Sequence, residues 1–222
     1  MPIFRDRTNE NRFVGTFRCV TSAAKQYASV PRLCRRKNTQ YHAIFGQNGC
    51  AIVHPSTTAT ALVALGASVE LVNAEGAKRR SLLGDFFLRP EQDIHRENDL
   101  KPGEVLLAIL LPKLPVRSRS VHLQQGEKDS FDWPLAAVAV SLTCDASGVC
   151  ERVSIILGAA APVPYRAKAA ESVLEGKTIG EPIVGKAGRA ALTGATPLSK
   201  NAYKLPIFEA LVRPAISATA SS

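Results

Sequence analysis

Cysteine is the side chain of this sequence best suited to metal or thiol chemistry, and five cysteines occur in 222 residues. Cys19, Cys34 and Cys50 fall in the first fifty residues, whereas Cys144 and Cys150 flank a short segment with the composition of a hairpin turn. The first ten residues lack the apolar region of a secretory signal, so we expect a cytoplasmic protein. Thiols stay reduced there, and a disulfide framework is not expected. We expect Cys144 and Cys150 to be chemically inert.

Histidine is the second reactive type, and His54 has the more informative neighbours. It precedes Pro55 and Ser56 in a turn, and the Ser56 hydroxyl can cap the helix that follows. His42 lies twelve positions before it, without the i, i+4 spacing of a helical zinc pair. The Gly-rich phosphate loops and the GxSxG nucleophile elbow are absent from the sequence. The residues alone therefore leave His54 open to either a structural or a binding role.

The composition indicates a folded protein with an unevenly placed positive charge. Hydrophobic residues make up 45% and charged residues 21%, and the net charge is +9. Residues 1–50 carry nine Arg and Lys against two acidic residues, which is a surface for an acidic partner or simply a solvated segment. A nucleic-acid-binding motif is lacking, so we expect no nucleic-acid partner. The longest apolar run, residues 105–111, has the length of a strand, so we expect no membrane span.

The elements that must position these residues form an α+β pattern. A short strand at 51–53 is expected before a helix at 58–65, which Gly66 ends, and a strand at 68–72 follows. The continuous apolar run 105–111 predicts a buried strand, and 135–143 with 152–157 predicts a hairpin. Further helices are expected over 164–174, 182–192 and 201–212. The domains follow as 1–50, 51–113 and 114–216, with an Ala/Ser tail at 217–222.

Five segments in order resemble the FAD-binding subunit of the xanthine dehydrogenase and aldehyde oxidoreductase family, the molybdenum hydroxylases. Each segment is weak alone, and together they extend over residues 41–216: 41–46 with 50–56 and 61–67, 85–88 with 100–105, 131–140, 157–167 with 170–177, and 197–204. The resemblance is greatest to the branch whose flavin subunit carries an iron–sulfur insertion. It implies the second lobe of a PCMH-type FAD-binding domain, followed by a CO-dehydrogenase-flavoprotein-like C-terminal α+β domain.

The same resemblance implies that the first FAD lobe is missing from this chain and that residues 1–50 are a degenerate insertion. That lobe carries a Gly-rich loop for the FAD pyrophosphate in the family, and Gly15 is the only glycine among residues 1–40. The turn residues His54, Pro55, Ser56 and Thr57 are then expected to contact FAD, with Thr57 in a place where the family usually has an acid. Ordinary turn packing is the competing interpretation.

Two further departures concern the flavin ring and the iron–sulfur cluster. Gln124 takes the place of a lysine that is common near the ring, and a neutral amide cannot favour the anionic reduced flavin. In the resembling branch Cys50 would be the last ligand of a [4Fe–4S] cluster, with Cys34 and Cys19 before it. A fourth cysteine before Cys50 is lacking, so the cluster either uses another ligand or is lost.

The function implied by the resemblance is a truncated FAD-binding electron-transfer subunit of an oxidoreductase acting on aldehydes or purines. Its partners would be a molybdenum-cofactor subunit and a [2Fe–2S] subunit of a heterotrimer, in the cytoplasm or, through a partner, in the periplasm. The alternative is a non-catalytic remnant that docks on partner subunits without binding FAD. Substrate and electron acceptor are not encoded in these residues, since both are chosen elsewhere in such complexes.

Overall fold

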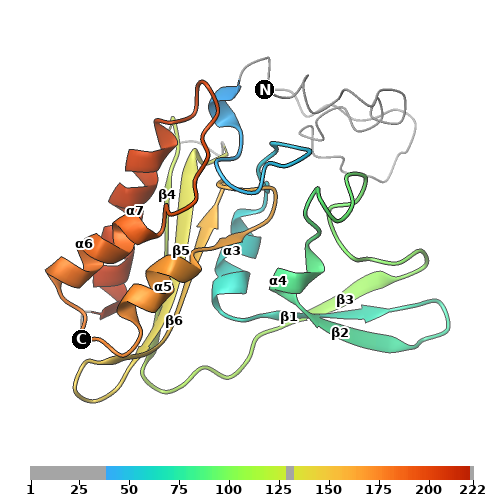
Figure 1. Cartoon of the computed structure of the whole chain (residues 1–222). Coiled ribbons are helices and arrows are strands. Elements are labelled where there is room, and N and C mark those ends of the chain that lie inside the picture. Colours follow the sequence, from blue (N-terminus) through green and yellow to red (C-terminus); the bar gives the residue numbers. More distant parts are fainter. Residues whose placement is uncertain (1–38, 129–132, 221–222) are drawn as a thin grey trace.

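The computed structural model describes residues 39–128 and 133–220, which form two antiparallel sheets (Figure 1). Residues 1–38, with Cys19 and Cys34, lie outside the described part. In the described ranges, no helix is long and apolar enough to cross a membrane. The α+β class expected from the sequence is confirmed.

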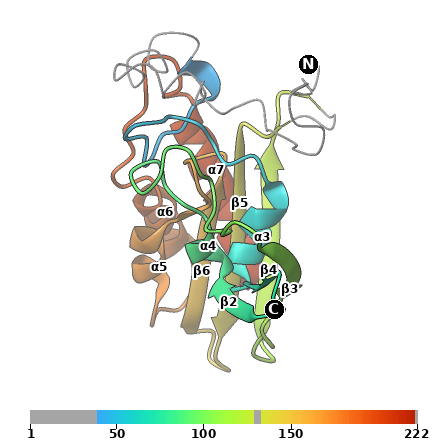
Figure 2. The ribbon, with the colours of Figure 1, turned by 90° about the vertical axis from the view of Figure 1, so that its right-hand side faces the viewer.

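The larger sheet has the order β4-β5-β6-β7, with β4 Ser118–Gln125, β5 Ala136–Cys144, β6 Cys150–Gly158 and β7 Tyr165–Arg166. One face is covered by α5 Lys168–Leu174, α6 Glu181–Ala190 and α7 Lys204–Ala220 (Figure 1). The opposite face is covered by α3 Thr57–Ala64, which lies in front of the strands in Figure 2 with α7 behind them. The sheet is thus enclosed between two helical layers.

Strand periodicity explains how one sheet serves both layers. Successive side chains of a strand point to opposite faces. Val138, Val140 and Leu142 of β5 join the core under α5, α6 and α7. Ala139 points the other way and packs against Ala64 of α3. The β5–β6 hairpin confirms the hairpin expected from the sequence, and its turn is closed by Asp145 and Gly148.

The smaller sheet has the order β2-β1-β3, with β1 Ser68–Val72, β2 Lys78–Leu82 and β3 Val105–Leu110. Val69 and Leu71 of β1 are fully buried against Leu83 and Phe86 of the short helix α4 Leu83–Phe86. A 3-10 turn, η1 Thr39–Tyr41, begins the described chain. The strand at 68–72 has the bounds expected from the sequence.

Four expectations from the sequence are corrected. Residues 51–53 form no strand. The carbonyl of Ala51 accepts one hydrogen bond from Ala43 N–H, and this single bond does not continue into a ladder. The apolar run 105–111 is a strand but not a buried one, since Val105 is 59% and Leu107 is 50% exposed. The helix expected from 164 begins only at Lys168, after β7 pairs with β6. Helix α7 continues to Ala220 and so includes most of the expected tail.

Candidate functional site

The amino end of α3 presents donors on a surface turn. Ser56 is the N-cap in extended conformation, and its Oγ accepts a hydrogen bond from Ala59 N at 3.1 Å. The first N–H groups of a helix have no acceptor inside the helix, so those of Thr57 and Thr58 are available at the amino end of α3. The first turn carries no acidic side chain that would occupy them. This end of α3 therefore suits an oxygen acceptor or an anion.

His54 is fixed immediately before this helix by three contacts. Its backbone N donates to Ala161 O at 2.9 Å, its Nδ1 accepts from Ser56 N at 3.3 Å, and its ring meets Phe87 edge-on at 4.4 Å. Burial lowers the pKa of His54 to about 4, so the ring is neutral near pH 7. Since Nδ1 accepts a hydrogen bond, the single proton of the neutral ring lies on Nε2. The turn thus offers a neutral Nε2–H donor.

The sheet face beside α3 contains a row of three residues that lie opposite one another on adjacent strands. Gln124 on β4 lies opposite Ala137 on β5, which in turn lies opposite Gly158 on β6. A Cβ at Gly158 would meet Thr60 Oγ1 at 2.5 Å, so only glycine lets α3 approach this closely. Opposite residues share one face of a sheet, which places the exposed Gln124 on the same face as α3.

The structure therefore brings the expected flavin residues to one side of the larger sheet. His54, Pro55, Ser56 and Thr57 form one continuous turn at the start of α3. Gln124 lies on the same face but two strands away from Gly158, and none of the hydrogen bonds found in the described chain joins it to the turn. The turn and Gln124 are thus separate contributors to one surface.

Of the three expected iron–sulfur ligands, Cys50 lies in the described residues, and Cys19 and Cys34 lie outside them. Cys50 is 5% exposed and lines a hollow between loop 88–97 and Pro162. Within residues 39–128 and 133–220, no group of three His, Cys, Asp or Glu side chains is placed to hold a metal ion. Cys144 and Cys150 face each other across the hairpin as free thiols, and burial raises the pKa of Cys150 to about 12. A thiol protonated to that extent is a poor metal ligand.

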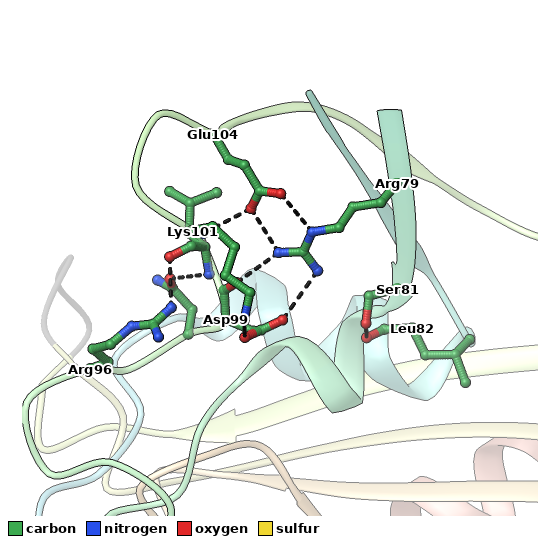
Figure 3. Close-up of polar contacts among 9 residues, drawn as sticks. Arg79, Ser81, Leu82, Arg96, Asp99, Lys101 and Glu104 are labelled. Carbon is green, nitrogen blue, oxygen red and sulfur yellow. Dashed lines mark hydrogen bonds and ion pairs between the residues drawn. The ribbon is translucent and has the colours of Figure 1, made fainter. Parts of the chain in front are cut away.

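An ion-pair network in the smaller sheet was not foreseen from the sequence. Arg79 of β2 donates to both carboxylate oxygens of Glu104 at 2.7 Å and to Asp99 Oδ2 at 3.1 Å (Figure 3). Lys101 N also donates to Glu104 at 2.8 Å, and Arg79 is the main cause that lowers the pKa of Glu104 to about 2. The network ties β2 to the loop that leads into β3. Its members are 20 and 25 positions apart from Arg79, so no local spacing signals it.

Two family patterns match the chain in the order of its two sheets. Residues 36–114 match the FAD binding domain in molybdopterin dehydrogenase, and residues 122–219 match the CO dehydrogenase flavoprotein C-terminal domain. The first match contains the His54 turn, α3 and the smaller sheet, and the second contains the rest of the larger sheet after the first residues of β4.

Among similar proteins is the aldehyde oxidoreductase FAD-binding subunit PaoB of Escherichia coli, 33% identical over 137 residues, which are 61% of this chain and 41% of that protein. The carbon monoxide dehydrogenase medium chain of Afipia carboxidovorans is 32% identical over 61% of this chain and 44% of its own length. This chain therefore spans less than half the length of these two relatives.

Solved structures agree with this assignment of the fold. Carbon monoxide dehydrogenase of Hydrogenophaga pseudoflava superposes with a TM-score of 0.63 and 26% identity, over 72% of this chain and 55% of that one. Quinoline 2-oxidoreductase of Pseudomonas putida superposes with a TM-score of 0.64 over 91% of this chain and 70% of that one. At 22% identity the latter supports the fold alone.

Proposed function

Because the chain belongs to the family of FAD-binding subunits of the molybdenum hydroxylases, we propose that it forms part of an FAD site in an electron-transferring oxidoreductase complex. Bound FAD would supply the redox chemistry, and the residues of this chain would hold and orient it. A molybdenum-cofactor subunit and a [2Fe–2S] subunit are the proposed partners. Aldehydes or purines are the proposed substrates, and the aldehyde oxidoreductase relative supports the first of these.

The observation that carries this proposal is the donor set at the His54 turn. Hydrogen-bond donors at this turn suit the oxygen-rich and carbonyl groups of FAD: the N–H groups of Thr57 and Thr58, the Ser56 cap and the neutral Nε2–H of His54. The turn is held by the Ala161 carbonyl, which comes from the second matched domain. The residues present therefore fit a flavin nucleotide, although the match covers only part of the relatives' length.

Gln124 would act on the flavin as a neutral hydrogen-bonding group. It is exposed on the sheet face that α3 shares, where its amide can donate a hydrogen bond without adding positive charge. Positive charge near the ring favours the anionic reduced flavin, and a neutral amide lacks this effect. We propose that the chain binds a flavin that is harder to reduce than one with a lysine at this position.

A second function, docking on partner subunits without FAD, is favoured by the uncovered apolar side chains of β3.

The iron–sulfur hypothesis is separate and is supported only by the position of Cys50 and by the sequence of the residues before 39. Iron and sulfide analysis of the full chain after anaerobic reconstitution measures it directly. Less than one iron per chain would remove the cluster from the proposal.

An absorbance spectrum of the purified chain, before and after FAD is added and removed by desalting, tests the main function. Retained flavin bands shifted from those of free FAD are the expected result. The variant Thr57→Pro removes one helix N–H at a position where proline is compatible with the helix, and we expect FAD affinity to fall several-fold. Helix α6 is remote from this turn and already has Pro182 in its first turn. Gly180→Ala at the N-cap of α6 is the control and should leave the affinity for FAD unchanged. A chain that never retains FAD would support the docking function instead.

A further inference from the structure

Lys204 is a buried ammonium group that the site described above does not use. It is the first residue of α7 and is 1% exposed. Its Nζ donates to Ala159 O at 2.6 Å and to His42 O at 3.3 Å. None of the ion pairs found in the described residues includes it. A buried charge held only by carbonyls is costly, so its retention calls for a specific role.

The two carbonyls that Lys204 holds belong to different segments. His42 lies in the stretch that leads to the His54 turn, and Ala159 follows directly after β6. Asn201 supports the first segment, since its Nδ2 donates to His42 O at 2.9 Å and to Ala43 O at 3.1 Å. The amino end of α7 thus joins the segment before α3 to the end of β6.

The backbone next to Ala159 then carries this link to His54. Ala159 has a φ of +58°, a conformation that residues other than glycine rarely adopt. The next carbonyl, of Ala160, accepts from Ile44 N at 2.8 Å and Phe45 N at 3.1 Å. The Ala161 carbonyl accepts from His54 N at 2.9 Å. The bond from Lys204 to Ala159 therefore helps to hold a strained turn whose next two carbonyls fix the His54 segment.

We propose that Lys204 is a positioning residue for the flavin-side turn, because its Nζ donors hold Ala159 and His42 together so that Ala161 can fix His54. The inference deepens the proposed function and depends on it for its consequence on FAD. Protonated or neutral, the Lys204 nitrogen carries at least two N–H donors, one for each of these carbonyls. Loss of these donors should therefore loosen residues 42–56 without unfolding the sheet.

The charge state of Lys204 can be changed near neutral pH. Burial lowers the pKa of Lys204 to about 8. The titratable groups beside it are His42, whose pKa burial and then the charge of Lys204 lower from 6.5, and Tyr203, whose pKa burial raises from 10. Between pH 7 and 9, Lys204 is therefore the one of these three groups that changes its charge.

Amide hydrogen exchange of the full chain tests the position of the turn without relying on FAD. In Lys204→Met, which keeps the volume of the side chain, we expect the amides of Ile44, Phe45 and His54 to exchange at least tenfold faster. The amides inside β5 should keep their protection. Lys186→Met on the exposed side of α6 is the matched control and should change neither set. Unchanged exchange at the three amides, or equal loosening of β5, would overturn the proposal.

The wild-type chain provides a second measurement that does not require the variant to fold. After correction for intrinsic exchange, protection of the same three amides should rise several-fold between pH 7 and 9, because the ordered turn holds Lys204 with a lowered pKa and the opened turn returns it to water. The dissociation constant for FAD should fall over the same range in the wild type and be higher but independent of pH in Lys204→Met. If the wild type never binds FAD, the proposed function fails, while the exchange results still decide the role of Lys204. Constant protection from pH 7 to 9 would count against that role.

Discussion

The two sheets of this molecule have similar apolar strands but very different cover. Strand β5 of the larger sheet lies between α3 on one face and α7 on the other, and Leu142 is 1% exposed. Strand β3 of the smaller sheet is at least as apolar, yet Ile109 is 45% exposed and Leu107 is 50% exposed. An apolar run therefore predicts a tendency to be buried, whereas burial itself depends on which other segments cover the strand.

The free edges of the two sheets differ in the same sense. Strand β4 borders the larger sheet with polar residues such as Arg119, Ser120 and Gln125, which discourage pairing with another strand. Strand β3 borders the smaller sheet with an uninterrupted apolar sequence from Val105 to Leu110. An exposed apolar edge of this kind is an association surface. The larger sheet thus has a polar edge at β4 that disfavours association, whereas the smaller sheet has an apolar edge at β3 that favours it.

Shortening one leucine in each sheet should give the largest difference between them. Leu142→Ala removes a buried side chain from the covered sheet, and we expect it to lower the free energy of unfolding by about 3 kcal/mol. Leu107→Ala removes the same atoms from β3, where half the side chain already meets solvent, and should cost less than about 1 kcal/mol. Urea unfolding of both variants measures this contrast. Equal losses would mean that β3 is covered in solution.

The stability of the larger sheet should depend on pH in the alkaline range, and that of the smaller sheet in the acid range. Lys204 next to the larger sheet has its pKa lowered to about 8, so the native state loses this proton before the unfolded state does. Its contribution to the free energy of unfolding should therefore rise by about 2 kcal/mol between pH 7.5 and 9.5. Urea unfolding across this range checks the sign. Lys204→Met should lack the rise.

In the smaller sheet the carboxylate of Glu104 has its pKa lowered to about 2, first by Arg79. The stability that this group contributes is present above pH 4.5 and is lost as the pH falls through about 2. Hydrogen exchange of β2 and β3 at acid pH should therefore increase before that of β5. In Glu104→Gln, the exchange of β2 and β3 should no longer increase before that of β5 as the pH falls. Simultaneous loosening of both sheets in the wild type would contradict this prediction.

The smallest effect on folding is expected from a charge placed on β3. Leu107→Lys puts an ammonium group on a half-exposed position, so the free energy of unfolding should change by less than about 0.5 kcal/mol. Self-association measured by sedimentation should nevertheless decrease, because a lysine at a strand edge blocks pairing. Ser120→Lys on the polar edge β4 is the matched control and should not alter association. A wild-type chain that stays monomeric at high concentration would refute the expectation.

Features set by neighbouring residues were predictable from the sequence. Ser56 caps α3, Gly66 follows its end, and the turn 145–148 closes the β5–β6 hairpin, as expected. Each depends on bonds between residues a few positions apart, so the sequence carries the whole signal. The order of the two domains was also found, through a resemblance that the family matches confirm. The contacts of the His54 turn and of Gln124 with FAD stay predictions.

The errors lie where distant segments decide the outcome. The run at 105–111 was expected to be buried because its pattern is apolar on both faces, and the described chain leaves it exposed. Residues 51–53 were expected to be a strand, yet Ala51 O accepts only from Ala43 N among the backbone bonds found in the described chain. The next residue, His54, donates to the carbonyl of Ala161, which lies more than a hundred positions away. No local spacing reveals which partner a backbone group will find.

The approximate positions of the helices, the hairpin, the capping of α3 and the family pattern were readable from the sequence, since these follow from short-range bonds and ordered motifs. The folded structure was needed to show that His54 is neutral with its proton on Nε2, that Arg79 binds Glu104, and that Lys204 lies buried between two carbonyls. Burial and charge are set by the segments that surround a side chain. Those segments come together only when the chain folds.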